Sequence, residues 1–352
     1  MEMEHYKELE PFSLRTKEKK FFFEKELSLL TLHHYKKSKE YKKILKFFNY
    51  NLKNKELGKV PFLPTRLFKE FDLISVSKKK ILKVLKSSGT TGSKPSKINL
   101  DKENARIQTL TLTKIMQTVL GNNRLPMLII DQDPKIQNRS TFNARAAAIY
   151  GFSIFGKDPT YLLNKKNEID YKILNLFLKK YANKNFFIFG FTSLVFDNLV
   201  LKLSQKLIKN DFKNGILVHG GGWKKMENLK VTNKSFKDKL SKKLKLKNVY
   251  NYYGLVEQTG SIFIECKDCS SFVTSIFSDV LIRDKHLNIV KDGEKGLIQL
   301  FSLLPKSYPG HSILTEDLGK IVNNNCKCKA RGKRFVVYGR AKESEIRGCS
   351  DV

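Results

Sequence analysis

The segment Lys86–Lys97 has the sequence KSSGTTGSKPSK, which gathers hydroxyl residues, glycines and lysines in one short stretch. Such a segment offers many hydrogen-bond donors on a flexible backbone, as a loop that wraps a polyphosphate requires. An apolar strand pattern precedes it and an amphipathic helical pattern follows it, so the sequence predicts a phosphate-binding loop. The loop is not a Walker A motif, because its glycine spacing differs from G-x-x-x-x-G-K-[ST]. An ordinary Ser/Gly linker is the structural alternative.

Downstream of this loop, helical and strand periodicities alternate along the chain. Such alternation is typical of α/β proteins, whose ligand sites lie at the carboxyl ends of the strands. The expected helices are Ile107–Leu120, Tyr171–Tyr181 and Leu194–Ile208, and the expected strands are Pro126–Asp131, Phe186–Phe189, Gly215–Trp223 and Asn248–Gly254. Beyond Ser261 the runs FIEC, VLIRD, LIQLFSLL and RFVVYG predict a β-rich part.

Upstream of the loop, the first 85 or so residues are expected to be mainly helical. Leu27–Phe48 carries apolar residues at helical spacing, with lysines on the opposite face. Pro61 and Pro64 end this region, and no long linker separates independent domains.

The composition indicates a folded, soluble protein, since 41% of the 352 residues are hydrophobic. The acidic start MEMEHYKELE gives no expectation of a secretory signal. The most apolar stretch, Phe186–Leu201, is interrupted by Gly190 and Asp197 and is too short to span a bilayer. We therefore expect no membrane span and a cytoplasmic location.

The formal charge of +33 raises the alternative of a basic nucleic-acid-binding protein. Only eleven of the 67 basic residues are Arg, whereas bidentate recognition of phosphates and bases favours Arg. The lysines are also scattered along the whole chain. We therefore expect no nucleic-acid partner.

The five cysteines favour a reducing compartment with free thiols or metal ligands. Cys266 and Cys269 form a C-x-x-C pair, and Cys326 and Cys328 form a C-x-C pair. The two pairs predict a possible structural Zn²⁺ site of four thiolates, with free buried thiols as the alternative. Cys349 stands alone near the carboxyl end.

A glycine-rich segment, HGGGW, begins at His219. It resembles a lipase oxyanion-hole motif, but the chain contains no G-x-S-x-G nucleophile pentad. Gly220, Gly221 and Gly222 are better explained by close approach of the backbone to a flat ligand, or by a plain strand-to-helix turn.

The segment YYGLVEQTG begins with Tyr252, Tyr253 and Gly254 and carries Glu257 five residues after the first tyrosine. A tyrosine ring can stack on adenine, and the carboxylate can hold Mg²⁺ against phosphate oxygens. A hairpin with a surface glutamate is the structural alternative.

In this order, SSGTTG, a glycine-rich strand end, YYGLVEQ, TEDLG at Thr315–Gly319 and Gly339-Arg340 resemble the adenylate-forming superfamily of acyl-CoA synthetases. The chain is more closely similar to the LuxE-type acyl-protein synthetases. Phrases that carry this narrower resemblance are LHHYKKSKEY, LPTRLFKEFDLISV, SSGTTGSKPSKI, FIFGFTSL, YYGLVEQTGSIFIEC, SLLPKSYPGHSILTEDLG and EIRGCSD, which together extend over nearly the whole chain.

The resemblance implies an α/β adenylate-forming large domain. It places a helical region at residues 1–85, an ATP- and acyl-binding adenylation domain at 86–338 and a short tail at 339–352. It implies ATP and Mg²⁺ as cofactors. The phosphates would contact Ser87, Ser88, Gly89, Thr90, Thr91, Gly92 and Lys94. The adenine would be flanked by Gly220, Gly221, Gly222 and Tyr252, and Tyr253 and Gly254 would also bind ATP. Glu257 would bind Mg²⁺, Asp317 would bind the ribose, and Arg340 would lie near the ribose or a phosphate.

For the reaction, the resemblance implies that a carboxylic acid, expected to be a fatty acid, is activated to acyl-AMP and passed to Cys349 as a thioester. An acyl-CoA-reductase-like protein would then accept the acyl group. An inert terminal thiol is the alternative for Cys349. FFIFGFTSLVF suggests an apolar acyl pocket or simply a core strand and helix.

The chain departs from the superfamily pattern after Arg340, because only twelve residues follow where a small mobile domain with a catalytic lysine is expected. CoA ligation therefore becomes less favoured, and an acyl-CoA or carrier-protein ligase of the same fold is the alternative function.

Overall fold

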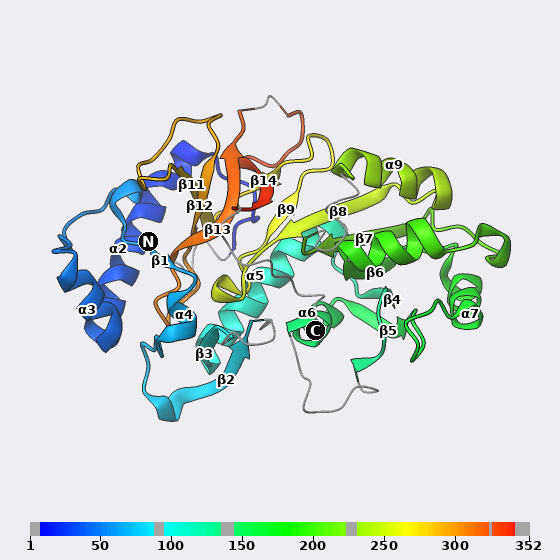
Figure 1. Ribbon diagram of the computed structural model, residues 1–352, viewed down its shortest axis with the longest axis horizontal. Helices are drawn as coiled ribbons and strands as arrows, with labels where there is room; N and C mark the ends of the chain where they lie inside the picture. Colours follow the sequence, from blue (N-terminus) through cyan, green and yellow to red (C-terminus); the bar gives the residue numbers. More distant parts are fainter. Residues whose placement is uncertain (1–7, 88–94, 135–143, 223–230, 324–325, 342–352) are drawn as a thin grey trace. The chain divides into compact units, whose positions relative to one another are not determined.

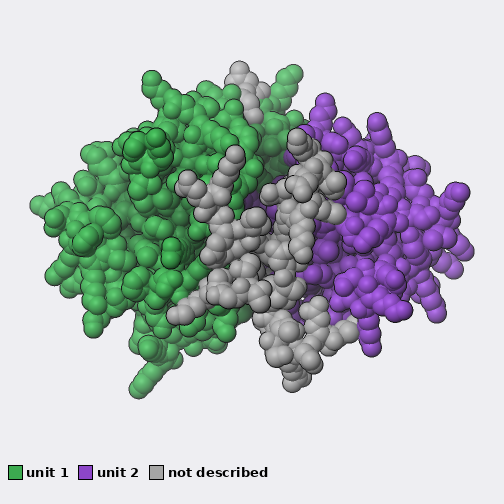
Figure 2. All heavy atoms as spheres, viewed as in Figure 1, with its two compact units in different colours: residues 1–115, 254–345 green, residues 116–253, 346–352 purple. Residues whose placement is uncertain are grey.

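The computed structural model describes residues 8–87, 95–134, 144–222, 231–323 and 326–341. Two compact units make up the chain, coloured separately in Figure 2. Unit 1 comprises Met1–Ile115 and Gly254–Glu345, and unit 2 comprises Met116–Tyr253 and Ile346–Val352. The chain thus leaves unit 1 for unit 2 within a helix and returns directly after a strand.

Unit 2 contains five parallel strands in the order β5-β4-β6-β7-β8 (Figure 1). They are β4 (Leu125–Ile129), β5 (Gly156–Tyr161), β6 (Phe186–Phe191), β7 (Gly215–Gly220) and β8 (Asn248–Tyr253). Every residue of β6 and β7 is buried, as expected for central strands of a parallel sheet that is covered on both faces. The apolar run FFIFGF is therefore a core strand.

The helices of unit 2 are α6 (Ala144–Ser153), α7 (Tyr171–Tyr181), α8 (Thr192–Val195) and α9 (Asn233–Leu244). Side chains of α7 and α9 share one hydrophobic core with β6 and β7, including Leu178, Leu240, Ile188 and Leu217. Asp170 caps α7 by accepting a hydrogen bond from the backbone N–H of Ile173 at 2.9 Å.

The prediction of one long α-helix at Leu194–Ile208 is wrong. The chain makes the short helix α8, then the π-helical turn η5 (Phe196–Lys202) and the 3-10 turn η6 (Gln205–Leu207). The amide of Asn198 donates to the carbonyl of Leu194 at 3.0 Å, and the N–H of Leu203 bonds to the carbonyl of Asn198 at 2.8 Å. The second bond spans five residues, as in a π-helix, and the run ends at Leu203, whose backbone is extended. The apolar residues of the run still enter the core.

Unit 1 contains a mainly antiparallel set of strands in the order β11-β12-β13-β14-β10-β9, with β1 parallel to β13 (Figure 1). They are β1 (Leu63–Pro64), β9 (Phe263–Glu265), β10 (Phe272–Val273), β11 (Ser278–Arg283), β12 (Gly296–Ser302), β13 (Ser312–Ile321) and β14 (Arg334–Arg340). A separate hairpin pairs β2 (Ile81–Lys86) with β3 (Lys97–Asp101). The β-rich part predicted beyond Ser261 is confirmed.

The helical elements of unit 1 lie mostly at its amino-terminal end. They are α2 (Thr16–Lys37), α3 (Lys39–Phe47), α4 (Leu67–Glu70), α5 (Lys102–Leu120, which enters unit 2 at Met116) and the 3-10 turns η1 (Leu57–Lys59), η2 (Lys78–Lys80) and η8 (Val256–Gln258). The predicted helix Leu27–Phe48 is divided at Ser38. The side chain of Ser38 accepts from the backbone N–H of Tyr41 at 3.4 Å and so caps α3.

A buried ion-pair network anchors α2 to the strands of unit 1. Lys19 lies 3.1 Å from one carboxylate oxygen of Asp279, and Lys333 lies 2.8 Å from the other. Lys19 also donates to the carbonyls of Ser275 and Ser278. Burial alone would raise the pKa of Asp279, but the two lysines hold it at about 2.

Throughout the part of the chain that the structure describes, no helix has both the length and the apolar character that crossing a bilayer requires.

Candidate functional site

The base of the Ser/Thr/Gly loop is closed by two neighbouring serines. The hairpin of β2 and β3 pairs Lys86 with Lys97, the two ends of the loop. Beyond this pair, the N–H of Ser87 donates to the carbonyl of Ser96 at 3.1 Å, and the N–H of Ser96 donates to the Ser87 hydroxyl at 2.8 Å. The loop is therefore held between two paired strands, with α5 following the second strand.

The tip of this loop falls outside the described residues. Of the loop positions predicted to contact phosphate, Ser87 is described, whereas Ser88, Gly89, Thr90, Thr91, Gly92 and Lys94 are not.

Glu257 lies in η8 and is 5% exposed, so the alternative of a surface glutamate is wrong. Burial raises the pKa of its carboxyl group. The Ser96 hydroxyl and the positive charge of Arg340 act in the opposite direction, and the charge of Glu316 adds to the rise. A buried carboxyl group next to the base of a phosphate-loop candidate is chemically suited to bind a hard cation.

A network of buried polar groups fixes the turn that carries Glu257. The side-chain amide of Gln258 donates to the carbonyls of Leu300 and Gly310, at 3.2 and 2.8 Å. Gly260 has a φ of +88°, and a Cβ at this position would lie 2.6 Å from the carbonyl oxygen of Gln108. The glycine of EQTG is therefore required by close packing against α5.

Tyr308 connects the segment after β12 to the same region. Its hydroxyl accepts a hydrogen bond from the side-chain amide of Gln108 at 3.2 Å. Burial raises the pKa of Tyr308, and the charge of Glu257 raises it further. Gly310 is needed beside it, because a Cβ there would lie 2.3 Å from the Tyr308 ring and 2.7 Å from the carbonyl oxygen of Glu257.

Asp317 and Arg340 are brought together by the pairing of β13 with β14, in which they are direct partners. The guanidinium of Arg340 lies 3.3 Å from the carboxylate of Glu316, and the N–H of Ala341 donates to the Glu316 carbonyl at 2.9 Å. A register shift follows immediately at Leu318/Gly319. Such bulges redirect side chains, and they are common next to binding sites.

In unit 2, the first glycine after His219 lies against an aromatic ring. Gly220 pairs with Tyr252 across β7 and β8, and a Cβ on Gly220 would lie 2.3 Å from the Tyr252 ring. Gly221 has a φ of +78°, a backbone conformation that favours glycine. Within the fold itself, the flat group that the Gly220 backbone approaches is therefore the Tyr252 ring.

Tyr252 belongs to a stack of aromatic side chains. Its ring lies 4.9 Å from that of Phe152 and 6.5 Å from that of Phe189, centroid to centroid. Phe152 and Phe189 are themselves stacked at 4.4 Å. Packing on one side thus fixes the orientation of a half-buried tyrosine. Tyr253 ends β8, and Gly254 is the first residue after the return to unit 1.

His219 is a core residue. It is 1% exposed, its Nδ1 lies 2.9 Å from the hydroxyl of Thr192, and burial lowers its pKa to about 3. The Thr192 hydroxyl also donates to the carbonyl of Gly220 at 3.1 Å. The neutral imidazole therefore supports the position of the glycine segment.

Sequence reasoning missed Ser96 and Tyr308 as parts of the site. Both lie inside phrases that carry the family resemblance, SSGTTGSKPSKI and SLLPKSYPGH. Ser96 acts on a carboxyl group 161 positions away, and that contact depends on the fold of unit 1.

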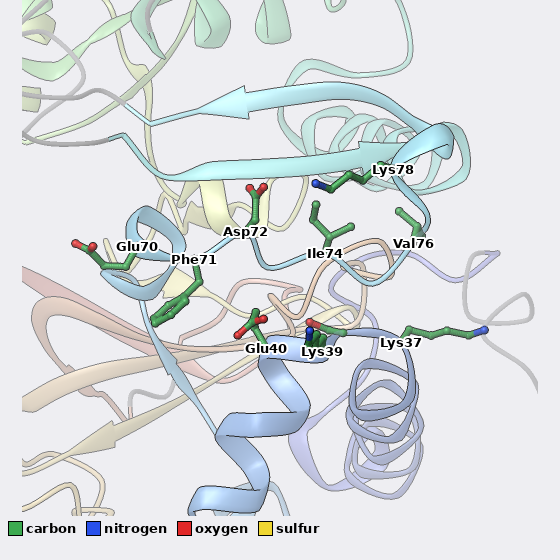
Figure 3. A pocket seen from close by; sticks show the side chains of 10 residues that line it. Lys37, Lys39, Glu40, Glu70, Phe71, Asp72, Ile74, Val76 and Lys78 are labelled. Atoms are coloured by element: carbon green, nitrogen blue, oxygen red, sulfur yellow. The ribbon is translucent and has the colours of Figure 1, made fainter.

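One pocket of unit 1 lies apart from all these residues. It has a volume of about 630 Å³, and none of the predicted site residues that the structure describes lines it (Figure 3). Its lining mixes charged and apolar side chains from the α2–α3 junction and the segment after α4: Lys37, Ser38, Lys39, Glu40, Glu70, Phe71, Asp72, Ile74, Val76 and Lys78.

The four paired cysteines are brought together. The Sγ atoms of Cys266 and Cys326 are 3.6 Å apart, and those of Cys266, Cys326 and Cys328 lie within 4.8 Å of one another. The thiol of Cys269 contacts those of Cys266 and Cys326. Cys349, the predicted acyl acceptor, lies outside the described residues.

Several solved adenylate-forming ligases share this fold. A 2-hydroxyisobutyryl-CoA ligase, solved in an open conformation with 2-HIB-AMP and CoA, matches with a TM-score of 0.73 at 13% identity. The match covers 94% of this chain and 77% of that one. The amide bond synthetase McbA from Marinactinospora thermotolerans matches with a TM-score of 0.51 at 14% identity, over 75% of this chain and 49% of that one.

A third structure, ATP-bound MatB from Rhodopseudomonas palustris, matches with a TM-score of 0.50 at 14% identity, over 77% of this chain and 50% of that one. The fold is thus that of the large domain of adenylate-forming ligases. Comparison with curated protein sequences gives no match.

The sequence itself defines the family more narrowly. Residues 6–352 match the family described as acyl-protein synthetase, LuxE. The chain belongs to this LuxE family, whose members are AMP-forming ligases, as its motifs predicted.

Proposed function

We propose that this protein uses ATP and Mg²⁺ to convert a carboxylic acid to acyl-AMP with release of pyrophosphate. The observation that carries the proposal is the buried Glu257, which lies near Ser96 at the base of the phosphate-loop candidate and near Arg340. This arrangement occurs in a chain of the LuxE family with an adenylate-forming fold.

The chemical reason for activation is that a carboxylate is a poor electrophile. Attack of its oxygen on the α-phosphorus of ATP forms a mixed anhydride and breaks the bond to pyrophosphate, so AMP becomes the leaving group of the next step. Mg²⁺ bound by Glu257 would neutralise charge on the phosphates. Burial of the carboxyl group suits this role, because the pKa raised by burial falls again when a cation is bound.

The remaining roles follow from where each residue lies. The loop that begins at Ser87 would donate hydrogen bonds to the phosphates. Asp317 would accept hydrogen bonds from the ribose hydroxyls, with its strand partner Arg340 near ribose or phosphate. In unit 2, Tyr252 would stack on adenine, because its ring is already oriented by Phe152 and Phe189.

For the second step we propose that Cys349 accepts the acyl group. Its thiolate attacks the carbonyl carbon of acyl-AMP, the carbon–oxygen bond to AMP breaks, and AMP leaves with the electron pair. Arg347, two residues away, would favour the thiolate if it lies nearby in space. The thioester would then pass to an acyl-CoA-reductase-like partner, and we expect the acid to be a fatty acid.

A screen for pyrophosphate release across acids of increasing chain length tests the first step. The expected result is release that requires both acid and ATP and is greatest for long apolar acids. Absence of release with every acid in the presence of Mg·ATP would contradict the proposal.

A CoA ligase is the second candidate, because a similar structure is a CoA ligase solved with CoA. The same assay with and without CoA separates the two functions. Rapid formation of acyl-CoA, without acyl transfer to the protein, would favour the ligase.

A further inference from the structure

The four cysteines outside the proposed reaction lie in two connections of unit 1. Cys266 directly follows β9, and Cys269 lies in the tight turn between β9 and β10. Cys326 and Cys328 lie between β13 and β14. β10 pairs with both β9 and β14, and the connection that leads into β14 brings Cys326 to within 3.6 Å of Cys266, Sγ to Sγ.

The turn that carries the first pair is well defined. The N–H of Cys266 donates to the carbonyl of Ser271 at 2.8 Å, and the N–H of Ser270 donates to the carbonyl of Cys266 at 2.9 Å. Ser270 adopts a φ of +54°, in the left-handed region. This tight backbone turn returns Cys269 toward Cys266, so that both thiols contact each other.

The distances between the sulfur atoms suit a shared metal ion. Zinc–sulfur bonds of about 2.3 Å in a tetrahedron place the sulfur atoms about 3.8 Å apart. The Sγ atoms of Cys266 and Cys326 are 3.6 Å apart, and the Sγ atom of Cys328 lies within 4.8 Å of both. Cys269 contacts Cys266 and Cys326 and is the fourth thiol of the cluster, although it is not one of the groups whose ligand atoms all lie within 4.8 Å of one another.

These four thiols are free, and none of them is in a disulfide. A carboxylate oxygen of Asp268 also lies within 4.8 Å of three of the sulfur atoms, so it competes with Cys269 as the fourth ligand. Four thiolates are the commoner set for structural zinc, and soft sulfur ligands select zinc over hard cations.

Arg334 supplies the positive charge that a cluster of thiolates needs. Its guanidinium donates to the Sγ of Cys328 at 2.8 Å and to the carbonyl of Ala330 at 2.7 Å. The same side chain also contacts Cys269. Zinc with four thiolates carries a net charge of −2, so a partly buried arginine beside two of the ligands stabilises the charged site.

We propose that Cys266, Cys269, Cys326 and Cys328 bind one structural zinc ion, which joins the β9–β10 turn to the connection between β13 and β14. All four coordination positions are taken by protein ligands, so the ion has no open position for a substrate. Its effect is to fix the start of β14, whose far end carries Arg340, the partner of Asp317. The site is independent of the proposed activity, since it uses none of the residues assigned to the reaction.

Metal analysis of the full-length protein tests this proposal directly. Protein purified without chelators from zinc-supplemented medium should contain about one zinc per chain. Replacement by cobalt should give the visible absorption of a tetrahedral tetrathiolate site. In the folded protein, four of the five thiols should resist a thiol reagent until a mercurial releases the metal.

Variants identify the ligands. Cys326→Ser and Cys269→Ser should each lower the zinc content about tenfold and the melting temperature by about 5 °C or more. Asp268→Asn and Lys327→Ala lie in the same two segments and should retain zinc. Loss of zinc in Asp268→Asn but not in Cys269→Ser would overturn the four-thiolate set.

Measurements on the unmodified protein decide the case if the cysteine variants fail to fold. Folded protein without zinc in which all five thiols react would overturn the proposal. Bound iron with no zinc, or a disulfide between any two of the four cysteines, would also overturn it.

Discussion

Replacing Glu257 by glutamine separates the chemical role of this residue from its structural role. The amide has the size and shape of the carboxyl group, and the Ser96 hydroxyl beside it remains available as a hydrogen-bond partner. The substitution removes only the negative charge that is proposed to bind Mg²⁺. We therefore expect the fold to remain intact.

The size of the effect follows from the burial of Glu257. A hydrogen bond or ligand contact to a charged group contributes about 1.5–3 kcal/mol, and the contribution is larger where water is excluded. A loss of about 2.7 kcal/mol corresponds to a hundredfold lower rate at 1.36 kcal/mol for each factor of ten. Acid-dependent pyrophosphate release at saturating Mg·ATP should therefore fall about a hundredfold.

The melting temperature of Glu257→Gln should not fall, in contrast to its rate of pyrophosphate release. Burial raises the pKa of Glu257 in the folded protein, so the folded state favours the protonated form. The stabilising effect of that preference is fully present below the ordinary pKa and is lost as the pH rises through the raised pKa. The glutamine variant has no ionisable group at this position, so it does not lose stability in this way as the pH rises. Near pH 8 its melting temperature should therefore be no lower than that of the wild type.

The control is Glu294→Gln, the same chemical change in an exposed turn of unit 1, which should leave the rate and the melting temperature unchanged. Pyrophosphate release at the wild-type rate in Glu257→Gln would refute the assignment of this carboxylate. A lower melting temperature together with lost activity would show that Glu257 acts through the fold.

Three further substitutions test other parts of the account. Gly220→Ala places a Cβ 2.3 Å from the Tyr252 ring, so we expect a loss of about 1–3 kcal/mol in stability and a higher KM for ATP, measured by denaturant unfolding and by kinetics. Asp279→Asn should cost about 3–5 kcal/mol of unfolding free energy, because Lys19 loses its buried counter-charge. Since the pKa of Asp279 is lowered to about 2, its contribution is present above its ordinary value of 3.8 and lost as the pH falls toward 2, and acid unfolding of the variant should lack this component. Arg340→Ala should raise the KM for ATP about tenfold with little change in melting temperature, because the side chains of its ion pair with Glu316 are 35% and 37% exposed, and an unchanged KM would remove it from the nucleotide site.

Strands with a strong apolar signal could be predicted from the sequence. The runs at β6 and β7 are buried along their whole length, so a continuous apolar pattern coincided with a central parallel strand. The helix α7 has the predicted bounds, because Asp170 caps its start and its apolar residues repeat at helical spacing.

Other elements depend on contacts that a local pattern does not contain. The division of the amino-terminal helix at Ser38 arises from one capping hydrogen bond. The strand β13 contains TEDLG, a polar sequence with no strand periodicity, and it forms because β12 and β14 pair with it on both sides. Tertiary pairing here overrides local preference.

The candidate site also combines features that the sequence predicts with features that only tertiary contacts create. The motif YYGLVEQTG identified Glu257, but its burial results from packing against α5 and the Tyr308 segment. The cysteine spacing suggested two pairs of ligands, whereas only the fold brings Cys266 and Cys326 to 3.6 Å.

The central claim is that the chain activates an acid and then carries the acyl group on Cys349, and self-labelling tests it most directly. The full-length protein is incubated with labelled fatty acid and Mg·ATP in the absence of CoA, and bound label is measured before and after neutral hydroxylamine. We predict label that hydroxylamine releases, as expected for a thioester, and that Cys349→Ser abolishes while acyl-AMP formation continues. Label that persists in Cys349→Ser, or no label at all alongside rapid acyl-CoA formation when CoA is added, would contradict the account.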